Sequence, residues 1–176
     1  MTAELGMNQN RHEVVFEALA PDVELPSRET EGSAGYDVRA YLVGRSVKTR
    51  LGCTGDLCDR AVESGRLTLD PGDVSLVPTG FKASVPVGYE AQVRIRSSMA
   101  FKRGLILPNA PGTIDADYPD EWLIMVKNDS AQAVVIEHGE RLAQVVLNRF
   151  EVVPWERGVV GLTTDRMGGF GSTGHA

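Results

Sequence analysis

Two acidic residues, Asp115 and Asp117, stand close together in the segment PNAPGTIDADYPDEW. In an extended strand, residues two apart share one face, so we expect the two carboxylates to point the same way. Such a pair suits a divalent cation, and a single carboxylate can serve as general base toward water. Tyr118 follows directly and offers a flat apolar ring with a polar tip. The alternative is a surface hairpin with two solvated acids, which an isolated Asp-x-Asp pair favours.

The segment RIRSSMAFKRG contains residue types that bind anions. Its pattern is that of a strand running into a helix, which would put Ser97 and Ser98 at the helix N-terminus. Free N–H groups and the helix dipole favour a negative charge at that end. Arg96 can bind a phosphate through two parallel hydrogen bonds. The alternative is an N-capped helix with a surface arginine, and the segment alone favours it.

Three polar residues occur where the surrounding sequence is apolar or tightly turned. Asp37 follows the small residues of GSAGYDVRA, and Arg141 and Gln144 interrupt the otherwise apolar GERLAQVVL. An arginine and an amide in a buried strand need hydrogen-bond partners. We expect them to bond each other, to bond a carboxylate, or to face a ligand.

The C-terminal segment GGFGSTGHA, residues 168–176, combines glycines with one aromatic residue. Glycines allow backbone N–H groups to converge on phosphate oxygens. Ser172 and Thr173 add hydroxyl donors, and Phe170 can stack on a nucleobase. The alternative is a disordered terminus, which fits the glycines but not the lone phenylalanine between them.

The elements that position these residues are predicted to be mainly strands. In YEAQVRIR apolar and polar residues alternate, and similar short runs recur between glycine- and proline-containing turns. This pattern predicts an all-β fold, either a sandwich or a barrel. Two segments are predicted to be helical. They are residues 56–65, with Asp56 as N-cap and Gly65 as stop signal, and residues 97–104.

Length and composition indicate one globular domain of 176 residues with a flexible polar leader over residues 1–11. The net charge of −6 argues against a nucleic-acid polymer as partner. A signal-peptide pattern and a membrane-length apolar run are both missing, so we expect a cytoplasmic protein that binds no membrane. Cys53 and Cys58 have no nearby histidine and predict two ordinary thiols, not a metal site.

Six motifs taken in order closely resemble those of the trimeric deoxyuridine triphosphatase (dUTPase) family: AGYDVRA, PTGF, RSSMAFKRG, NAPGTIDADY, GERLAQ and GGFGSTG. They span Ala34 to Gly174, most of the chain. The resemblance implies a jelly-roll-like β barrel with one or two short helices, and a homotrimer with active sites at subunit interfaces. It also implies hydrolysis of dUTP to dUMP and pyrophosphate with Mg²⁺, which limits uracil incorporation into DNA and supplies dUMP.

The resemblance assigns roles to the residues around Asp115. Asp115 matches the carboxylate that orients and deprotonates the attacking water. Tyr118 matches the tyrosine that packs on the deoxyribose and leaves no room for a 2′-hydroxyl. The residues that match the uracil pocket, partly through their backbone groups, are Asn109, Thr113, Ile114 and Leu123.

The resemblance likewise assigns the groups around the phosphates. Arg96, Ser97 and Ser98 match the phosphate-binding turn, with Ser98 where the family usually has glycine. Asp37, through water, and Gln144 match residues near the metal–phosphate network, and Arg141 looks structural. Residues 161–176 match a mobile glycine-rich tail that closes the active site from a neighbouring subunit. Its matching residues are Arg166, Phe170, Gly171, Ser172 and Thr173.

The β-barrel domain then spans residues 12–160, with an insertion over about 43–66 that carries none of the matched motifs and is expected to be a surface loop. Two other functions remain as alternatives. dCTP deaminases share the fold and have a motif like RSS, but the position of their proton-shuttling glutamate, three residues before Asn128, holds Met125. A non-catalytic nucleotide sensor on the same fold would be favoured by loss of Asp115 or of the tail, and both are present.

Overall fold

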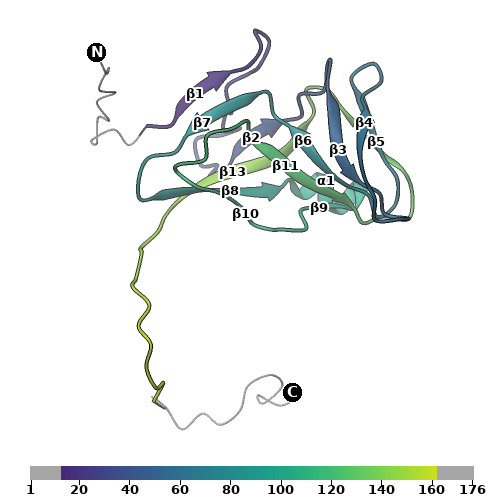
Figure 1. Ribbon diagram of the computed structural model, residues 1–176. Helices are drawn as coiled ribbons and strands as arrows, with labels where there is room; N and C mark the ends of the chain where they lie inside the picture. The colour runs from purple at the N-terminus through teal and green to yellow at the C-terminus, as the bar shows by residue number, and fades with distance from the viewer. Residues whose placement is uncertain (1–12, 162–176) are drawn as a thin grey trace, which may run out of the picture.

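The computed structural model of the protein describes residues 13–161. These residues form thirteen β-strands and one short helix, α1 (Ser97–Arg103), as Figure 1 shows. The predicted all-β class is confirmed, and the sheets, which stay open, agree with a jelly-roll-like arrangement. Within residues 13–161, no helix has the length and apolar character that crossing a membrane requires.

Two larger sheets form most of the body. The four strands of the first are hydrogen-bonded in the order β10 (Gly112–Ile114), β8 (Tyr89–Ile95), β13 (Arg141–Arg149) and β2 (Tyr36–Arg39). The five strands of the second follow the order β4 (Leu57–Ala61), β3 (Ser46–Arg50), β6 (Val74–Pro78), β11 (Leu123–Asn128) and β9 (Leu105–Ile106). Two ribbons complete the fold: β1 (Val15–Ala18) with β7 (Phe81–Ser84), and β5 (Arg66–Leu69) with β12 (Val134–Glu137).

The alternation in YEAQVRIR is the alternation of a half-buried strand. On β8, Ala91 and Val93 are buried whereas Arg94 is exposed. Val145 on β13 lies opposite Val93 and is buried as well. Because both large sheets bury one face in this way, their apolar side chains join in a single core.

One of the two predicted helices is wrong. Residues 57–61 form strand β4, which pairs antiparallel with β3 so that Cys58 lies opposite Thr49. The apolar spacing that predicted a helix face is not used for burial, since Leu57 is 80% exposed. Hydrogen bonding to β3 decides the conformation here, because tertiary pairing readily overrides a weak helix propensity.

The segment over residues 43–66 is part of the body and not the surface loop that the sequence predicts. Its strand β3 pairs with β6, and its Val47 and Thr49 side chains are buried. The Thr49 and Ser75 hydroxyls share a hydrogen bond of 2.7 Å across this pairing. Deleting the whole segment would therefore remove a core strand.

Asp73 ties the tip of the β3–β4 hairpin to the body. Its buried carboxylate accepts hydrogen bonds from the backbone N–H of Gly52 at 2.8 Å and of Asp70 at 2.9 Å. Arg60 of β4 pairs with the same carboxylate at 2.8 Å. Gly52 packs so closely that an added Cβ would lie 2.5 Å from the backbone of Gly72.

The two cysteines lie in this hairpin. Cys53 and Cys58 are both free and exposed. The two thiols are not joined to each other. No group of three or more metal-ligating side chains occurs among residues 13–161, so the structure offers these thiols no further ligands there.

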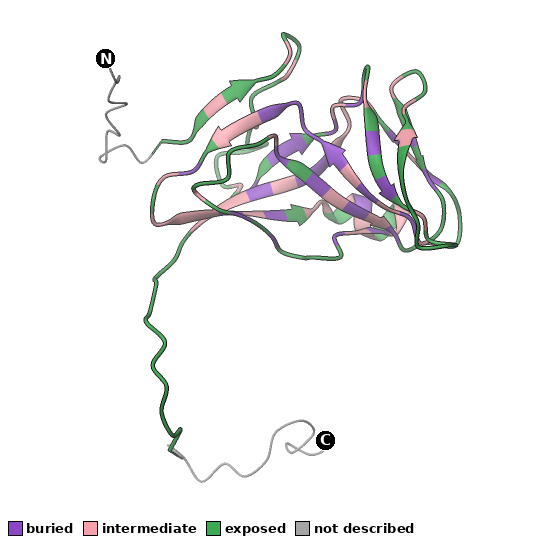
Figure 2. Ribbon diagram, viewed as in Figure 1, coloured by how far each residue is buried: buried purple, intermediate pink, exposed green. Residues whose placement is uncertain are grey.

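Beyond β13 the chain leaves the body as an extended arm, residues 150–161, which Figures 1 and 2 show running away from the sheets with exposed side chains. Several large apolar side chains are exposed on this arm: Val152, Val153, Trp155, Val159 and Val160. Trp155 is fully exposed, with a relative exposure of 101%, and none of residues 13–161 covers it. An apolar surface of this kind is typical of an interaction segment.

The Asp73 contacts predict a large stability effect. We expect Asp73→Ala to lower the free energy of unfolding by about 3 kcal/mol, because it leaves two backbone N–H groups without their acceptor and removes the buried carboxylate that pairs with Arg60. Urea denaturation followed by circular dichroism measures the change. Asp59→Ala is the control, because Asp59 only pairs with exposed Lys48 at 3.4 Å and should cost less than about 1 kcal/mol. Equal losses in the two variants would contradict the role given to Asp73.

Candidate active site

A shallow recess lies between β8, β10 and the beginning of β11. Four residues predicted to bind a base line it, namely Asn109, Thr113, Ile114 and Leu123. The other lining residues are mainly apolar: Val93, Leu107, Gly112 and Met125. A mostly apolar recess with one amide among its lining residues suits a flat heterocycle with a polar edge.

Gly112 makes room for the amide at this recess. The register of β10 and β8 puts Gly112 opposite Val93. A Cβ on Gly112 would lie 3.3 Å from Asn109 Nδ2 and 3.4 Å from Val93 Cβ. A side chain at this position would therefore displace the Asn109 amide or the floor of the recess.

Asp115 is the first residue after β10 and is exposed. Asp115 and Asp117 do not share a strand face as the sequence predicts, because the chain turns here and the Tyr118 N–H donates to the Asp115 carbonyl at 3.2 Å. The turn leaves the Asp115 carboxylate open to solvent beside the recess formed by its own strand. A solvent-facing carboxylate in this position can take a proton from water.

Tyr118 follows the turn, and the residue is 39% exposed. Its hydroxyl donates to the backbone carbonyl of Glu121 at 3.3 Å. The polar tip is thus tied to the chain, while part of the ring stays available to a ligand. An aromatic ring in this situation can pack against the apolar face of a sugar.

Asp37 stands at the centre of a buried charge cluster. It lies on β2 directly opposite Gln144 on β13, and Gln144 Nε2 donates to its carboxylate at 3.0 Å. Arg141 Nη1 donates to the other carboxylate oxygen at 3.0 Å, and Arg96 Nε lies 3.4 Å away. Of the three alternatives that the sequence leaves for Arg141 and Gln144, the geometry shows hydrogen bonding to a carboxylate.

Two residues that complete the cluster have no signal in the sequence. Glu29, in the loop before β2, pairs with Arg141. Hydrogen bonding to Glu29 and the negative charge of that carboxylate raise the pKa of Arg141, and Asp37 adds to the effect. The second residue is Gly35. A Cβ at this position would lie 3.0 Å from Gln144 Cβ, so only glycine leaves room for the Gln144 side chain. Both could be found only once the β2–β13 register was known.

The predicted anion-binding turn forms a helix N-terminus. Arg96 occupies the N-cap position without a side-chain capping bond, and Ser97 and Ser98 are the first residues of α1. Ser97 is exposed and Ser98 is partly buried. The turn therefore presents backbone N–H groups, hydroxyls and the Arg96 guanidinium near the Asp37 cluster.

Asp115 and Arg96 lie at opposite ends of β8. The register pairs Ile114 with Ala91, so Asp115 comes out beside the start of β8, whereas Arg96 follows its end. Six residues of extended strand separate the two levels, roughly 20 Å. One copy of the chain therefore does not bring the Asp115 carboxylate and the Arg96 turn to the same phosphate.

The described residues can bind a metal ion only together with water and substrate phosphates. Residues 13–161 contain no cluster of three metal-ligating side chains, so they build no all-protein metal cage. Mg²⁺ usually keeps several waters and binds to one or two carboxylates plus substrate phosphates. Asp37, already bonded by Gln144 and two arginines, fits contact with such an ion through water.

Five predicted site residues lie outside the described residues: Arg166, Phe170, Gly171, Ser172 and Thr173.

Two described residues, Met125 and Asn128, distinguish this site from that of a dCTP deaminase. Met125 lines the recess, and its thioether cannot shuttle a proton. Asn128 is buried, and its amide donates to the carbonyls of Leu69 and Gln132.

Comparison with known proteins gives consistent matches. The dUTPase family model matches residues 62–174. The deoxyuridine 5′-triphosphate nucleotidohydrolase of Desulfotalea psychrophila is 44% identical over 153 residues, which cover 86% of this chain and 88% of that protein. The same enzyme of Leptospira interrogans is 35% identical over 166 residues, covering 92% of this chain and 99% of that protein. The crystal structure of dUTPase from Streptococcus mutans superposes with a TM-score of 0.60 at 31% identity, covering 80% of this chain and 98% of that chain.

Proposed function

The chain belongs to the dUTPase family, and we propose that it hydrolyses dUTP to dUMP and pyrophosphate with Asp115 as the general base. The observation that carries this proposal is the Asp115 carboxylate, exposed at the end of the strand that also lines the recess beside Asn109. The relatives named above are dUTP hydrolases by name, and Met125 at the recess opposes the deaminase alternative.

The reaction we propose is an attack of water on the α-phosphorus. Asp115 orients a water molecule and takes one of its protons as the oxygen bonds to phosphorus. The bond from the α-phosphorus to the oxygen that bridges it to the β-phosphorus breaks, and pyrophosphate leaves with that oxygen. Asp115 then releases its proton to solvent. The exposure of the turn around Asp115 supports this role, since both water and solvent protons reach it.

Base and sugar are recognised by the recess and by Tyr118. Asn109 and the backbone near Thr113 bond the uracil edge, while Ile114 and Leu123 enclose its ring. Val93 and Met125 also line the recess, and we propose that they exclude a 5-methyl group. Tyr118 packs on the deoxyribose at C2′, so a 2′-hydroxyl would collide with its ring.

The phosphates bind at the N-terminus of α1. Arg96, Ser97 and Ser98 supply a cation, hydroxyls and N–H groups, and Gln144 stands beside them. Mg²⁺ would be held by the phosphates with Asp37 contributing through water, and it supplies positive charge against the charge that develops on the leaving group.

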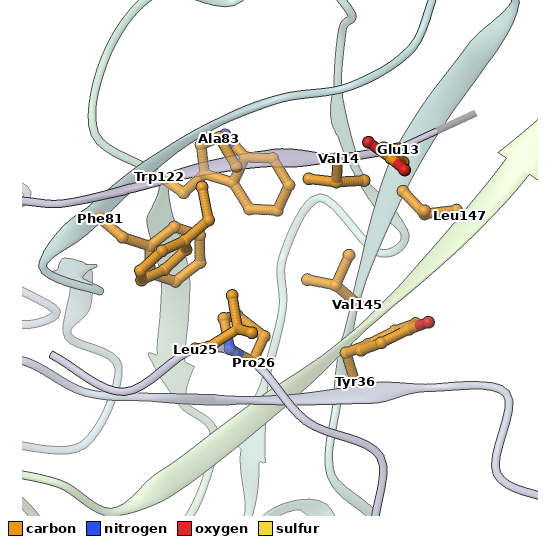
Figure 3. A pocket seen from close by; sticks show the side chains of 11 residues that line it. Glu13, Val14, Leu25, Pro26, Tyr36, Phe81, Ala83, Trp122, Val145 and Leu147 are labelled. Carbon is orange, nitrogen blue, oxygen red and sulfur yellow. The ribbon is translucent and has the colours of Figure 1, made fainter. Parts of the chain in front are cut away.

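We propose that a second copy completes each site, in a homotrimer. The separation of Asp115 from Arg96 along β8, longer than a triphosphate, supports this assembly. A cavity of about 320 Å³ on the body supports it too, because its lining is mostly apolar (Figure 3). Phe81, Trp122 and Leu147 belong to that lining, and the Trp122 Nε1 has no hydrogen-bond acceptor among residues 13–161. The exposed apolar arm of a neighbouring copy is the occupant we propose.

The tail then closes the site from that neighbouring copy. Phe170 stacks on uracil, Gly171, Ser172 and Thr173 donate to phosphate oxygens, and Arg166 reaches toward the terminal phosphate. Closure excludes bulk water from the reacting phosphorus.

Asp115→Asn should keep nucleotide binding and lose turnover by roughly 10²-fold or more, because an amide cannot accept the proton. Wild type and variant are incubated with dUTP, dCTP, dTTP or UTP and Mg²⁺, and the products are separated by chromatography. The wild type should yield dUMP and pyrophosphate from dUTP alone. Asp117→Asn is the matched control in the same exposed turn and should stay near wild type. Full dUTP turnover by Asp115→Asn would exclude Asp115 as the base.

Tyr118→Ala should raise the kcat/KM for UTP relative to dUTP by roughly 10-fold or more, since the steric block at C2′ is removed. Tyr118→Phe keeps the ring, loses only the hydrogen bond to Glu121, and should preserve the discrimination. Steady-state kinetics with both nucleotides measures the ratio. An unchanged ratio in Tyr118→Ala would mean that another group selects the sugar.

Two truncations separate the arm from the tail. Ending the chain after Thr164 should preserve the trimer and sharply lower kcat/KM, whereas ending it after Arg149 should abolish assembly as well. Light scattering coupled to size-exclusion chromatography measures the assembly. Phe170→Ala should cost about 5- to 150-fold in kcat/KM, the equivalent of one lost stacking contact. Full activity without the tail, or a trimer without the arm, would refute the corresponding proposal.

A further inference from the structure

One ion pair joins the 43–66 segment to the loop that follows Asp115. Arg45 Nη2 donates to the carboxylate of Glu121, and the two side chains are only 33% and 17% exposed. Arg45 comes from the turn before β3, whereas Glu121 ends the loop that carries Asp115 and Tyr118. The pair therefore links a segment without matched motifs to the residues proposed to do the chemistry.

Arg45 is itself held firmly in place. Its backbone N–H donates to the Leu42 carbonyl at 3.2 Å, and Leu42 is completely buried. The Leu42 N–H in turn donates to Nδ1 of His138 at 3.1 Å. The Arg45 guanidinium also lies 5.8 Å from the centre of the Tyr41 ring, within the range of a cation–π contact. Because the Arg45 guanidinium is held in place, it can hold the Glu121 carboxylate in one position.

Glu121 holds the loop between Asp115 and β11 in place through further hydrogen bonds. Its Oε1 accepts a 2.7 Å hydrogen bond from the backbone N–H of Gly80, a glycine whose Cβ would collide with Tyr41 at 2.8 Å. Its backbone carbonyl accepts the Tyr118 hydroxyl. The next residue is pinned as well, because the Trp122 N–H donates to the Phe81 carbonyl at 3.1 Å.

The other side of the loop offers weaker support. Residues 117–120 are exposed, and the ion pair between Lys82 and Asp120 spans 3.9 Å at the surface. Ala116 packs only partly against the core. The Glu121 anchor is thus the strongest polar constraint described between Asp115 and β11, and Arg45 neutralises its charge.

We propose that Arg45 is a positioning residue, which acts through Glu121 to set the Tyr118 ring for substrate. The expected change in KM and in the UTP to dUTP ratio rests on the proposed dUTP hydrolysis. The structural consequence, a loop that is less ordered without Arg45, does not depend on which nucleotide is the substrate. The 43–66 segment thereby acts on substrate selection without touching the substrate.

The test compares Arg45→Met, Glu121→Gln and the double variant by steady-state kinetics with dUTP and UTP. Arg45→Met should raise the KM for dUTP by roughly 3- to 30-fold, leave kcat within about twofold, and raise the UTP to dUTP ratio. The double variant should be no worse than the poorer single variant, because both remove one interaction. Arg45→Lys keeps the charge but not the planar fork and should recover part of the loss.

Hydrogen–deuterium exchange of residues 113–122, measured without nucleotide, gives an independent readout. Exchange should be faster in Arg45→Met and Glu121→Gln than in the wild type. Lys48→Met, which removes an exposed cation from the neighbouring strand, is the control and should match the wild type in kinetics and exchange. Arg45→Lys provides the comparison if Arg45→Met fails to fold.

The outcomes separate the two proposals. A wild type that does not hydrolyse dUTP refutes the proposed function, and the exchange experiment still decides the role of Arg45. Unchanged exchange and KM in folded Arg45→Met, or the same changes in Lys48→Met, would overturn the positioning role.

Discussion

Hydrogen bonding between β8 and its two neighbours decides where the chemistry of this protein can lie. Pairing with β10 sets Gly112 against Val93 and forms the recess beside Asn109. Pairing with β13 fixes the position of Gln144, which in turn lies opposite Asp37 on β2. A slip of one residue in either pairing would turn every side chain to the opposite face. The recess and the charge cluster therefore depend on the same strand register.

Buried acids in this fold are matched with arginines. Asp37 contacts Arg96 and Arg141, Asp73 contacts Arg60, and Glu121 contacts Arg45, each with further bonds from N–H groups. A carboxylate without such partners would be costly to bury. Although the chain has a net charge of −6, these enclosed sites are locally balanced, and the excess negative charge lies elsewhere. Pairing of this kind gives fixed geometry more than net stability.

The sequence predicts the parts of the site that come from continuous motifs. Period-two alternation identifies β8 and β13, and the glycine- and proline-rich turns separate the strands around them. The helix predicted over residues 56–65 is wrong, because pairing with β3 is a long-range effect that local spacing does not encode. Glu29 and Arg45 were not predicted for the same reason, since each meets its partner across 76 residues or more. The shared strand face of Asp115 and Asp117 was wrong because the turn begins immediately after β10.

Two features of the described residues are explained by the second copy that we propose. A lone copy would leave Trp155 fully exposed on the arm and an apolar cavity of about 320 Å³ uncovered on the body. The same lone copy would hold Asp115 at one end of β8 and the anion-binding turn at the other, out of reach of one phosphate chain. In this proposal, docking of the arm would cover both apolar surfaces, and the resulting contact between copies would bring an Asp115 turn and an Arg96 turn to the same phosphate chain. In the proposed assembly, burial of apolar surface and completion of the active site follow from the same contact between copies.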